Sequence, residues 1–262
     1  MNAMSEHPRK IRELIRRGEL TRPTCGLVPG YTQANVVILP EELAFDFFLF
    51  CQRNPKPCPV LEVLEPGNCE PVLTAPGADI RVDVPRYRIY QNGKLTSEER
   101  EITKYWRRDL VTFLLGCSFT FEGALIRAGI SLRHIEQGKN VAMYVTNLET
   151  VPARVFSGPL VVSMRPILRT KVVRAVQITS RFPMVHGAPV HIGDPERIGI
   201  TDLSRPDYGD PVEIKKDEVP VFWACGVTPQ AVALKSKPSL MITHSPGYMF
   251  LTDLLDEELS VL

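Results

Sequence analysis

The chain has 262 residues, 44% hydrophobic and 23% charged, which is typical of a soluble globular protein with a substantial core. Its 31 basic and 30 acidic residues leave a net charge of +1, so we expect no nucleic acid and no anionic membrane as a partner. No apolar run reaches the roughly 18–20 residues of a membrane span. The N-terminus also lacks the apolar segment of a signal peptide, and we therefore expect a cytoplasmic protein.

The first predicted elements precede residue 55. Residues 8–17 are expected to form a helix that stops at Gly18. The β-branched run NVVILP (35–40) predicts a buried strand, and EELAFDFFLFCQRN (41–54) predicts a buried helix that ends before a proline.

The next part of the chain is less regular. Residues 55–86 read as irregular chain or short strands, and an extended segment is expected to turn at Asn92-Gly93. SEEREITKYW (97–106) predicts a helix, with Ser97 as its cap.

Two later segments echo each other. DLVTFLLG (109–116) precedes Cys117, and DEVPVFWA (217–224) precedes Cys225; we interpret both runs as strands, since a proline inside the second disfavours a helix. Each cysteine is followed three residues later by a threonine, which we expect to cap a helix.

Further matches follow the two cysteines. The threonines are Thr120 and Thr228, and two residues after them stand Glu122 and Gln230. Each helix is expected to lead to a strand that ends in a histidine, and then to a Met-x-x-Thr run. The pattern predicts an internal repeat, about residues 109–147 and 217–253, within a single domain that spans 1–262.

These elements predict an α/β fold, with a mixed α+β arrangement as the alternative. We expect two pseudo-symmetric strand–Cys–helix–strand–His units around a shared mixed sheet. Each cysteine would then lie at the carboxyl end of a strand, where open α/β sheets bind ligands. The helix N-terminus beside it would bind an anion and lower the pKa of the thiol. The alternative is that both cysteines are small buried core residues.

The most polar stretch covers residues 181–210 and contains His186, His191 and Asp194. Imidazole and carboxylate groups can bind a metal, but their spacing here matches no standard metal motif, so we expect none. The six cysteines form no CxxC pair, which argues against a structural zinc site or a disulfide scaffold. A loop rich in His and Asp between Gly and Pro is more typical of a functional segment than of a surface turn.

Arginines are the expected partners of a carboxylate substrate, because a guanidinium binds it with two hydrogen bonds. The arginines considered for this role are Arg53, Arg81, Arg86, Arg165 and Arg181. The chain contains no phosphate-binding loop, GxSxG, HExxH or dinucleotide fingerprint, so no cofactor is expected.

Several longer runs together resemble a known family: PGYTQANVVILP, FFLFCQRNPKPCP, DLVTFLLGCSFTFE, LRHIEQGKNVAMY, VVSMRP, HGAPVHIGDP, PDYGD, PVFWACGVTPQ and ITHSPGYM. They resemble the hydro-lyase family of the YcsI type, to which a domain of the vertebrate mitochondrial D-glutamate cyclase is similar. The resemblance covers about residues 10–254, with Ala142 standing where the family pattern has proline. It implies a carbon–oxygen hydro-lyase that converts D-glutamate into 5-oxo-D-proline and water, but it does not specify the catalytic residues.

The residues themselves therefore supply the candidate site. The candidate catalytic groups are Cys117, Cys225, His134, His186, His191 and His244. The candidate substrate-binding groups are Thr120, Glu122, Thr228, Gln230, Arg165, Arg181 and Asp194. We expect a cofactor-independent hydro-lyase acting on a small amino or carboxylic acid. A racemase or epimerase with paired cysteines and a non-catalytic small-molecule binding protein are the alternatives, and a homodimer stays open.

Overall fold

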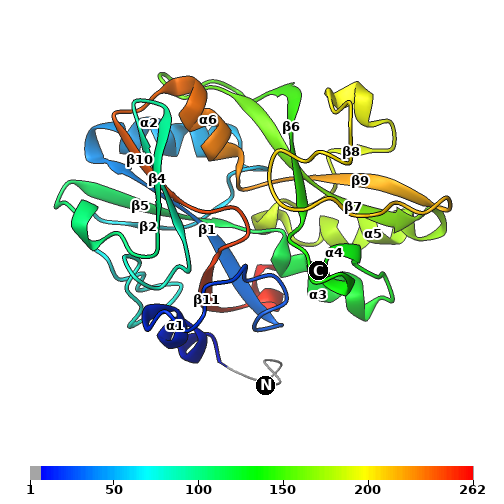
Figure 1. Cartoon of the computed structure of the whole chain (residues 1–262), viewed down its shortest axis with the longest axis horizontal. Helices are drawn as coiled ribbons and strands as arrows, with labels where there is room; N and C mark the ends of the chain where they lie inside the picture. The colour runs from blue at the N-terminus through cyan, green and yellow to red at the C-terminus, as the bar shows by residue number, and fades with distance from the viewer. Residues whose placement is uncertain (1–6, 262) are drawn as a thin grey trace.

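The computed structural model describes residues 7–261, which mix helices with strands in two separate antiparallel sheets (Figure 1). The mixture of helices and strands confirms the predicted fold class. A single shared sheet with parallel strands is not observed, because every strand pair in the described chain is antiparallel.

The larger sheet is built around β1 (Tyr31–Pro40), which is buried along almost its whole length. It pairs with β5 (Leu110–Gly116) on one side. On its other side it pairs first with β11 (Phe250–Leu255) and further along with β10 (Leu240–His244). The remaining strands are β2 (Val60–Leu64), β3 (Tyr87–Gln91) and β4 (Lys94–Glu99). The strand order is β2-β5-β1-β10-β3-β4.

The smaller sheet has four strands in the order β6-β7-β9-β8. Their bounds are Ala142–Glu149 for β6, Pro159–Leu168 for β7, Glu218–Ala224 for β9 and His191–Ile192 for β8. A bridge from Met143 of β6 to Tyr208 attaches the loop after β8 to this sheet.

Within residues 7–261, six α-helices flank the sheets. They are α1 (Pro8–Arg16), α2 (Glu41–Arg53), α3 (Phe119–Arg127), α4 (Arg133–Glu136), α5 (Val172–Ser180) and α6 (Thr228–Ser236). Short 3₁₀ helices are η2 (Thr103–Tyr105), η3 (Arg169–Lys171), η4 (Pro183–Val185), η5 (Pro195–Ile198) and η6 (Asp256–Leu259). None of the helices in the described chain is long and apolar enough to cross a membrane.

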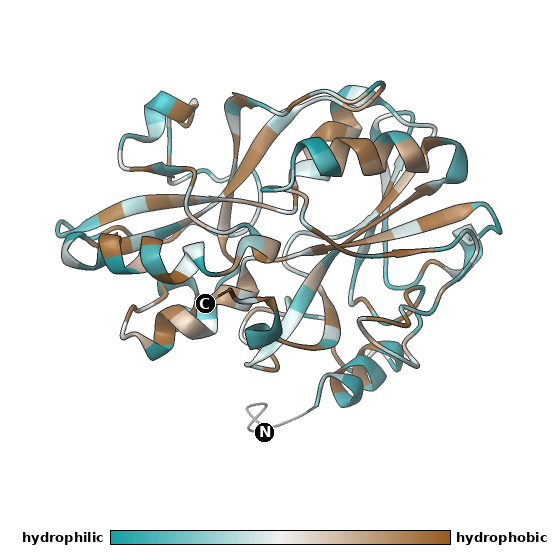
Figure 2. Ribbon diagram, turned by 180° about the vertical axis from the view of Figure 1, so that it is seen from behind, coloured by the Kyte–Doolittle hydropathy of each residue, from teal (hydrophilic) through white to brown (hydrophobic). Residues whose placement is uncertain are grey.

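The helices bury apolar faces against the two sheets. On the larger sheet, Phe47 of α2 contacts Phe113 of β5, with ring centroids 5.0 Å apart. On the smaller sheet, Phe121 of α3 and Ile178 of α5 pack around Trp223 of β9. Figure 2 shows the result: hydrophobic residues line the strands and the helix faces that meet them, while the outer faces are hydrophilic.

The chain passes between the sheets twice within residues 7–261. After β5 of the larger sheet it runs through α3 and α4 into β6 of the smaller sheet, and after β9 it runs through α6 into β10 of the larger sheet. Consequently the larger sheet is assembled from two distant parts of the sequence. The two crossings begin at Cys117 and Cys225, the two cysteines of the predicted internal repeat.

Most predicted elements before residue 55 are confirmed, as are the strands before the two cysteines and the turn at Asn92-Gly93. Both turn residues have positive φ, 49° and 74°, as a tight hairpin turn requires. The predicted helix over 97–106 is wrong. Its first residues belong to β4, because the hairpin pairs Ser97 with Ile89 of β3, and only η2 is helical.

The threonine caps are also wrong. Ser118 is the N-cap of α3 and Val227 that of α6, which places Thr120 and Thr228 inside the helices. Both threonines are buried. The hydroxyl of Thr228 donates to Cys225 O at 2.7 Å and accepts from the Val161 N–H at 3.1 Å.

Candidate active site between the two sheets

Cys117 and Cys225 meet in one buried cluster between the sheets. They are only 5% and 7% exposed. Beside each sulfur lies the N–H of the residue two positions later; the Phe119 N–H donates to Cys117 Sγ at 3.5 Å. The two echoing segments therefore face the same interior.

Asn35 of β1 joins the two crossing segments. Its Nδ2 donates to Gly116 O at 2.7 Å, just before the first cysteine. Its side chain also lies against Gly226, just after the second: a Cβ at that glycine would stand 2.0 Å from Asn35 Nδ2. The close approach of the two crossings depends on the missing side chain of Gly226.

After the first crossing, Glu122 of α3 forms a buried ion cluster. Arg165 of β7 donates to Glu122 Oε1 through Nε at 2.9 Å and Nη2 at 2.5 Å, and His134 Nε2 lies 3.0 Å from the same oxygen. The guanidinium also binds Ser118 and Ser163 and lies 5.4 Å from the Trp223 ring centroid. Burial opposes the charge of Glu122, but His134 and Arg165 hold the pKa of its carboxyl below the ordinary range.

After the second crossing, Gln230 of α6 forms a matching cluster. Its Oε1 accepts from Arg88 Nη1 at 3.3 Å and from the Tyr90 hydroxyl at 3.1 Å. Its Nε2 donates to His244 O at 2.9 Å. The ring of His244 bonds to β1 next to the last β1–β10 backbone pair, because its Nδ1 accepts from the Val36 N–H at 3.1 Å.

The two clusters share a plan: an arginine and a histidine gather around the Glu or Gln that follows each crossing. One difference lies in the histidines: His244 ends a strand as predicted, but the strand predicted to end at His134 is wrong, because His134 lies in the short helix α4. A second lies in charge, because Arg165 is paired with buried Glu122, whereas Gln230 is a neutral amide and Arg88 forms its ion pair with Glu98 instead. The internal repeat itself stays a prediction.

The expected activation of the thiols is not observed. Burial raises the pKa of Cys117, and it raises that of Cys225 to about 11, although a backbone N–H opposes the shift at both. Desolvation of a buried thiolate therefore outweighs the helix N-terminus. Burial also lowers the pKa of His186 and of His244 to about 4, so both rings are neutral at pH 7.

Four predicted site residues lie apart from the two clusters. His186 is buried, and its Nδ1 lies 2.7 Å from Lys56 O. His191 Nε2 lies 2.9 Å from Asp194 O, while the Asp194 side chain is exposed. Arg181 directly follows α5, and its Nε donates to Val261 O at 3.2 Å. These groups do not form a common site.

One trio within residues 7–261 has the spacing of metal ligands: Cys25, Glu122 and His134, whose ligand atoms lie within 4.8 Å of one another. The carboxylate of Glu122 is already bound by the Arg165 guanidinium, and a cation there would face that positive charge at close range. We therefore interpret this trio as part of the buried ion cluster.

A cavity of about 300 Å³ opens between the two sheets beside the Gln230 cluster. Its lining includes Arg86, Arg88, Glu98, Tyr208, Ser245 and Tyr248. Arg88 Nε donates to Glu98 Oε1 at 2.7 Å, and Arg86 Nη1 lies 3.7 Å from Glu98 Oε2. Arg88 therefore reaches from the cavity to buried Gln230, and Tyr208 packs on the cysteine cluster.

Two aromatic rings of this cavity form cation–π contacts with its arginines. Arg86 lies 4.8 Å from the ring centroid of Tyr248, and Arg88 lies 5.7 Å from that of Tyr208. Burial opposes the charge of Arg88, but hydrogen bonding to Glu98 raises the pKa of the guanidinium. Burial raises the pKa of Tyr208 to about 12, so its phenol stays protonated and can donate a hydrogen bond.

The sequence reasoning missed most of this cavity. Of its residues, only Arg86 was among the arginines considered. The others stand in PRYRIY, PDYGD and ITHSPGYM, apart from Glu98 in SEEREITKYW, and PDYGD and ITHSPGYM belong to the motifs that carry the family resemblance. Their types, Arg, Tyr and Ser near Pro and Gly, were a signal that could have pointed to a binding loop.

Comparisons with known proteins agree with that resemblance. A family model described as D-glutamate cyclase matches residues 111–253. A protein of Geobacillus kaustophilus named "Putative hydro-lyase GK2103" is 63% identical over 254 residues, 97% of each chain. "Putative hydro-lyase YcsI" of Bacillus subtilis is 60% identical over 255 residues, 97% of this chain and 99% of the relative.

Among solved structures, a nitrogen repressor-like protein from Methanococcus jannaschii matches with a TM-score of 0.39 and 10% identity, over 90% of this chain and 91% of that one. A similarity this low says nothing about function. The sequence matches, by contrast, span nearly the full length at high identity. By this evidence the chain belongs to the D-glutamate cyclase family.

Proposed function

We propose that the protein is a cofactor-independent hydro-lyase that removes water from a small acidic amino acid, converting D-glutamate into 5-oxo-D-proline. The observation that carries this proposal is the cavity between the sheets in which Arg86, Arg88 and Glu98 come together. Family membership supports the reaction class, because the relatives carry hydro-lyase names.

The cavity matches the charges of such a substrate. An acidic amino acid carries two carboxylates and one ammonium group, and the cavity offers two guanidiniums and the carboxylates of Glu98 and Asp207. Guanidinium groups bind carboxylates with two parallel hydrogen bonds, which holds the substrate in one orientation. A cavity of about 300 Å³ has room for a molecule of this size.

The neutral amide of Gln230 makes Arg88 a suitable ligand for substrate. Its oxygen orients the guanidinium without cancelling the charge. Arg165 differs, because it and its partner Glu122 are both buried, whereas Arg88 and its partner Glu98 line the cavity. We therefore assign substrate binding to Arg88, and we assign Gln230 and His244, whose backbone oxygen holds that amide, to positioning it.

The proposed reaction balances without a cofactor. The α-nitrogen forms a bond to the γ-carboxyl carbon, and one bond from that carbon to oxygen breaks. The ammonium nitrogen loses two protons and the departing oxygen gains two, which produces the amide and one water. Glu98 can accept a proton from nitrogen and return it to oxygen, while the guanidiniums stabilise the negative charge that develops on the γ-carboxyl oxygens.

The test is incubation of the purified protein with D-glutamate and, separately, with L-glutamate in deuterated water, followed by NMR and chiral chromatography. We expect 5-oxo-D-proline without deuterium at Cα. Deuterium at Cα would instead favour the racemase, and then Cys117→Ala or Cys225→Ala should abolish the exchange. Ligand affinity without turnover would favour a binding protein.

Variants test the assigned residues. Arg88→Gln and Glu98→Gln should each lower kcat/KM by about a hundredfold, because each removes a group that contacts the reacting atoms. Arg100→Gln is the matched control, since this exposed arginine directly follows β4 and lies outside the cavity lining. Equal activity of Arg88→Gln, Glu98→Gln and the control would contradict the proposed site.

A further inference from the structure

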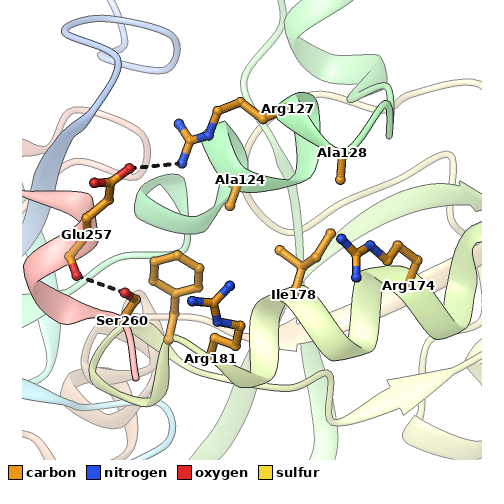
Figure 3. A pocket seen from close by; sticks show the side chains of 9 residues that line it. Ala124, Arg127, Ala128, Arg174, Ile178, Arg181, Glu257 and Ser260 are labelled. Atoms are coloured by element: carbon orange, nitrogen blue, oxygen red, sulfur yellow. Dashed lines mark hydrogen bonds and ion pairs between the residues drawn. The ribbon is translucent and has the colours of Figure 1, made fainter. Parts of the chain in front are cut away.

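A second cavity, of about 390 Å³, lies on the outer side of α3 and α5 (Figure 3). Three arginines line it against a single glutamate, Glu257. Arg127 extends from α3 on one side, while Arg174 and Arg181 extend from the region of α5 on the other. Ala124 and Ile178 contribute to an apolar floor between the two helices.

The charges of this cavity are only partly compensated. Arg127 Nη2 lies 3.9 Å from Glu257 Oε1, a long pair between exposed side chains, and Arg181 Nε donates to a backbone oxygen. Arg174 forms no ion pair or hydrogen bond that is assigned within residues 7–261. An excess of positive charge in a concave site favours anions, and guanidiniums are well suited to carboxylate and phosphate oxygens.

The same two helices, α3 and α5, also pack against the buried ion cluster of Glu122 and Arg165. α3 carries Glu122 on its inner side, two residues from Ala124 of the cavity. α5 carries Thr179, whose Oγ1 accepts from Trp223 Nε1 at 3.1 Å, and the Trp223 ring flanks Arg165. An anion that draws Arg127 and Arg174 together would therefore act on the two helices that hold this cluster.

We propose that this cavity is a second binding site, separate from the cavity between the sheets. Its ligand is a small oxyanion with at least two negative charges, which belong either to a phosphate group or to two carboxylates. The site bridges α3 and α5 through Arg127, Arg174 and Arg181. It does not depend on the function proposed for the cavity between the sheets.

Calorimetric titration of the full-length protein at fixed ionic strength tests the site, with inorganic phosphate in one arm and succinate in the other. Saturable binding in either arm supports the site, and the tighter ligand identifies the source of the oxyanion. Arg174→Gln should weaken binding by about tenfold, the effect of one lost charge-assisted hydrogen bond. The affinity of Arg174→Lys should lie between those of the wild type and Arg174→Gln, because lysine keeps the charge and loses the planar guanidinium.

Arg100→Gln is again the control, because it removes one exposed positive charge elsewhere and should leave the affinity unchanged. A second readout is independent of the calorimetric heat: in a Trp106→Phe background, the fluorescence of Trp223 should change with the same affinity as the titration, since its N–H bonds to α5. Heat reproduced by chloride at equal ionic strength, or equal weakening by Arg174→Gln and Arg100→Gln, would overturn the site.

Discussion

Glu122 and Gln230 occupy comparable positions after the two crossing cysteines, yet they do different work. The carboxylate of Glu122 is 3% exposed and compensates the charge of fully buried Arg165. The amide of Gln230 is equally buried but neutral, and Arg88 pairs instead with Glu98 in the lining of the cavity. This difference of one oxygen against one NH₂ group is the reason why the proposed substrate-binding site lies beside Gln230 and not beside Glu122.

This difference makes the charge of Glu122 important for stability. Glu122→Gln should lower the free energy of unfolding by about 3 kcal/mol at pH 7, because it leaves Arg165 buried without a counter-charge. Its folded pKa is lowered from the ordinary 4.5, so the stabilisation is present above that pH and is lost as the pH falls through the folded pKa. Urea unfolding of variant and wild type at pH 7 and pH 4 measures both effects.

The matched control is Glu136→Gln, because this carboxylate also pairs with an arginine, Arg133, but is half exposed. An exposed pair contributes little to stability, and the control should change it by less than about 1 kcal/mol. Equal losses in the two variants would show that the buried charge is not what Glu122 supplies.

At the scale of elements, two strands that end in different sheets deliver their cysteines to one place. Asn35 binds the backbone of the first crossing and lies against Gly226 in the second. The packing of β1 therefore controls how closely the two crossings approach.

Gly226→Ala should destabilise the protein by about 2 kcal/mol or more, because the new methyl group would overlap the Asn35 side chain. The same substitution in an Asn35→Ala background should cost much less, since the opposing side chain is gone. Thermal unfolding of the two single variants and the double variant yields the coupling energy. Additive losses would contradict the proposed contact.

The elements differ in how well the sequence predicted them. The runs before Cys117 and Cys225 are apolar and bounded by turn residues, so their strands follow from local pattern. SEEREITKYW has helix-forming composition, but pairing with β3 makes its first part a strand. The cavity residues Arg88 and Glu98 come together only through that pairing, which residue types do not reveal.

At the scale of the whole molecule, the two sheets depend on each other. The larger sheet needs strands from before residue 117 and after residue 239, and the whole smaller sheet lies between them in the chain. The buried cluster around the cysteines contains Cys117, which follows β5 of the larger sheet, and Cys225, which follows β9 of the smaller sheet. We therefore expect one cooperative unfolding transition for both sheets.

The two tryptophans make this expectation testable. Trp106 packs on the core of the larger sheet, and Trp223 belongs to the smaller one. Trp106→Phe and Trp223→Phe each leave a single tryptophan, and the tryptophan fluorescence of each variant can be compared with its own far-UV circular dichroism. Within each variant the two transitions should coincide in urea, whereas a fluorescence midpoint separated from the dichroism midpoint would indicate independent unfolding.

The sequence by itself determined the family, the mixture of helices and strands, and the two cysteine segments, because long motifs and apolar runs are local properties of the chain. The candidate site residues that the sequence predicted include Glu122, Gln230, Arg165, His134 and His244. The sequence did not predict the contacts that these residues make. Only the tertiary structure decided that the sheets are separate and antiparallel, and that burial raises the pKa of both thiols. It also decided that the open, charged cavity lies beside Arg88. Pairing and desolvation depend on residues that are far apart in the chain, and no local pattern records them.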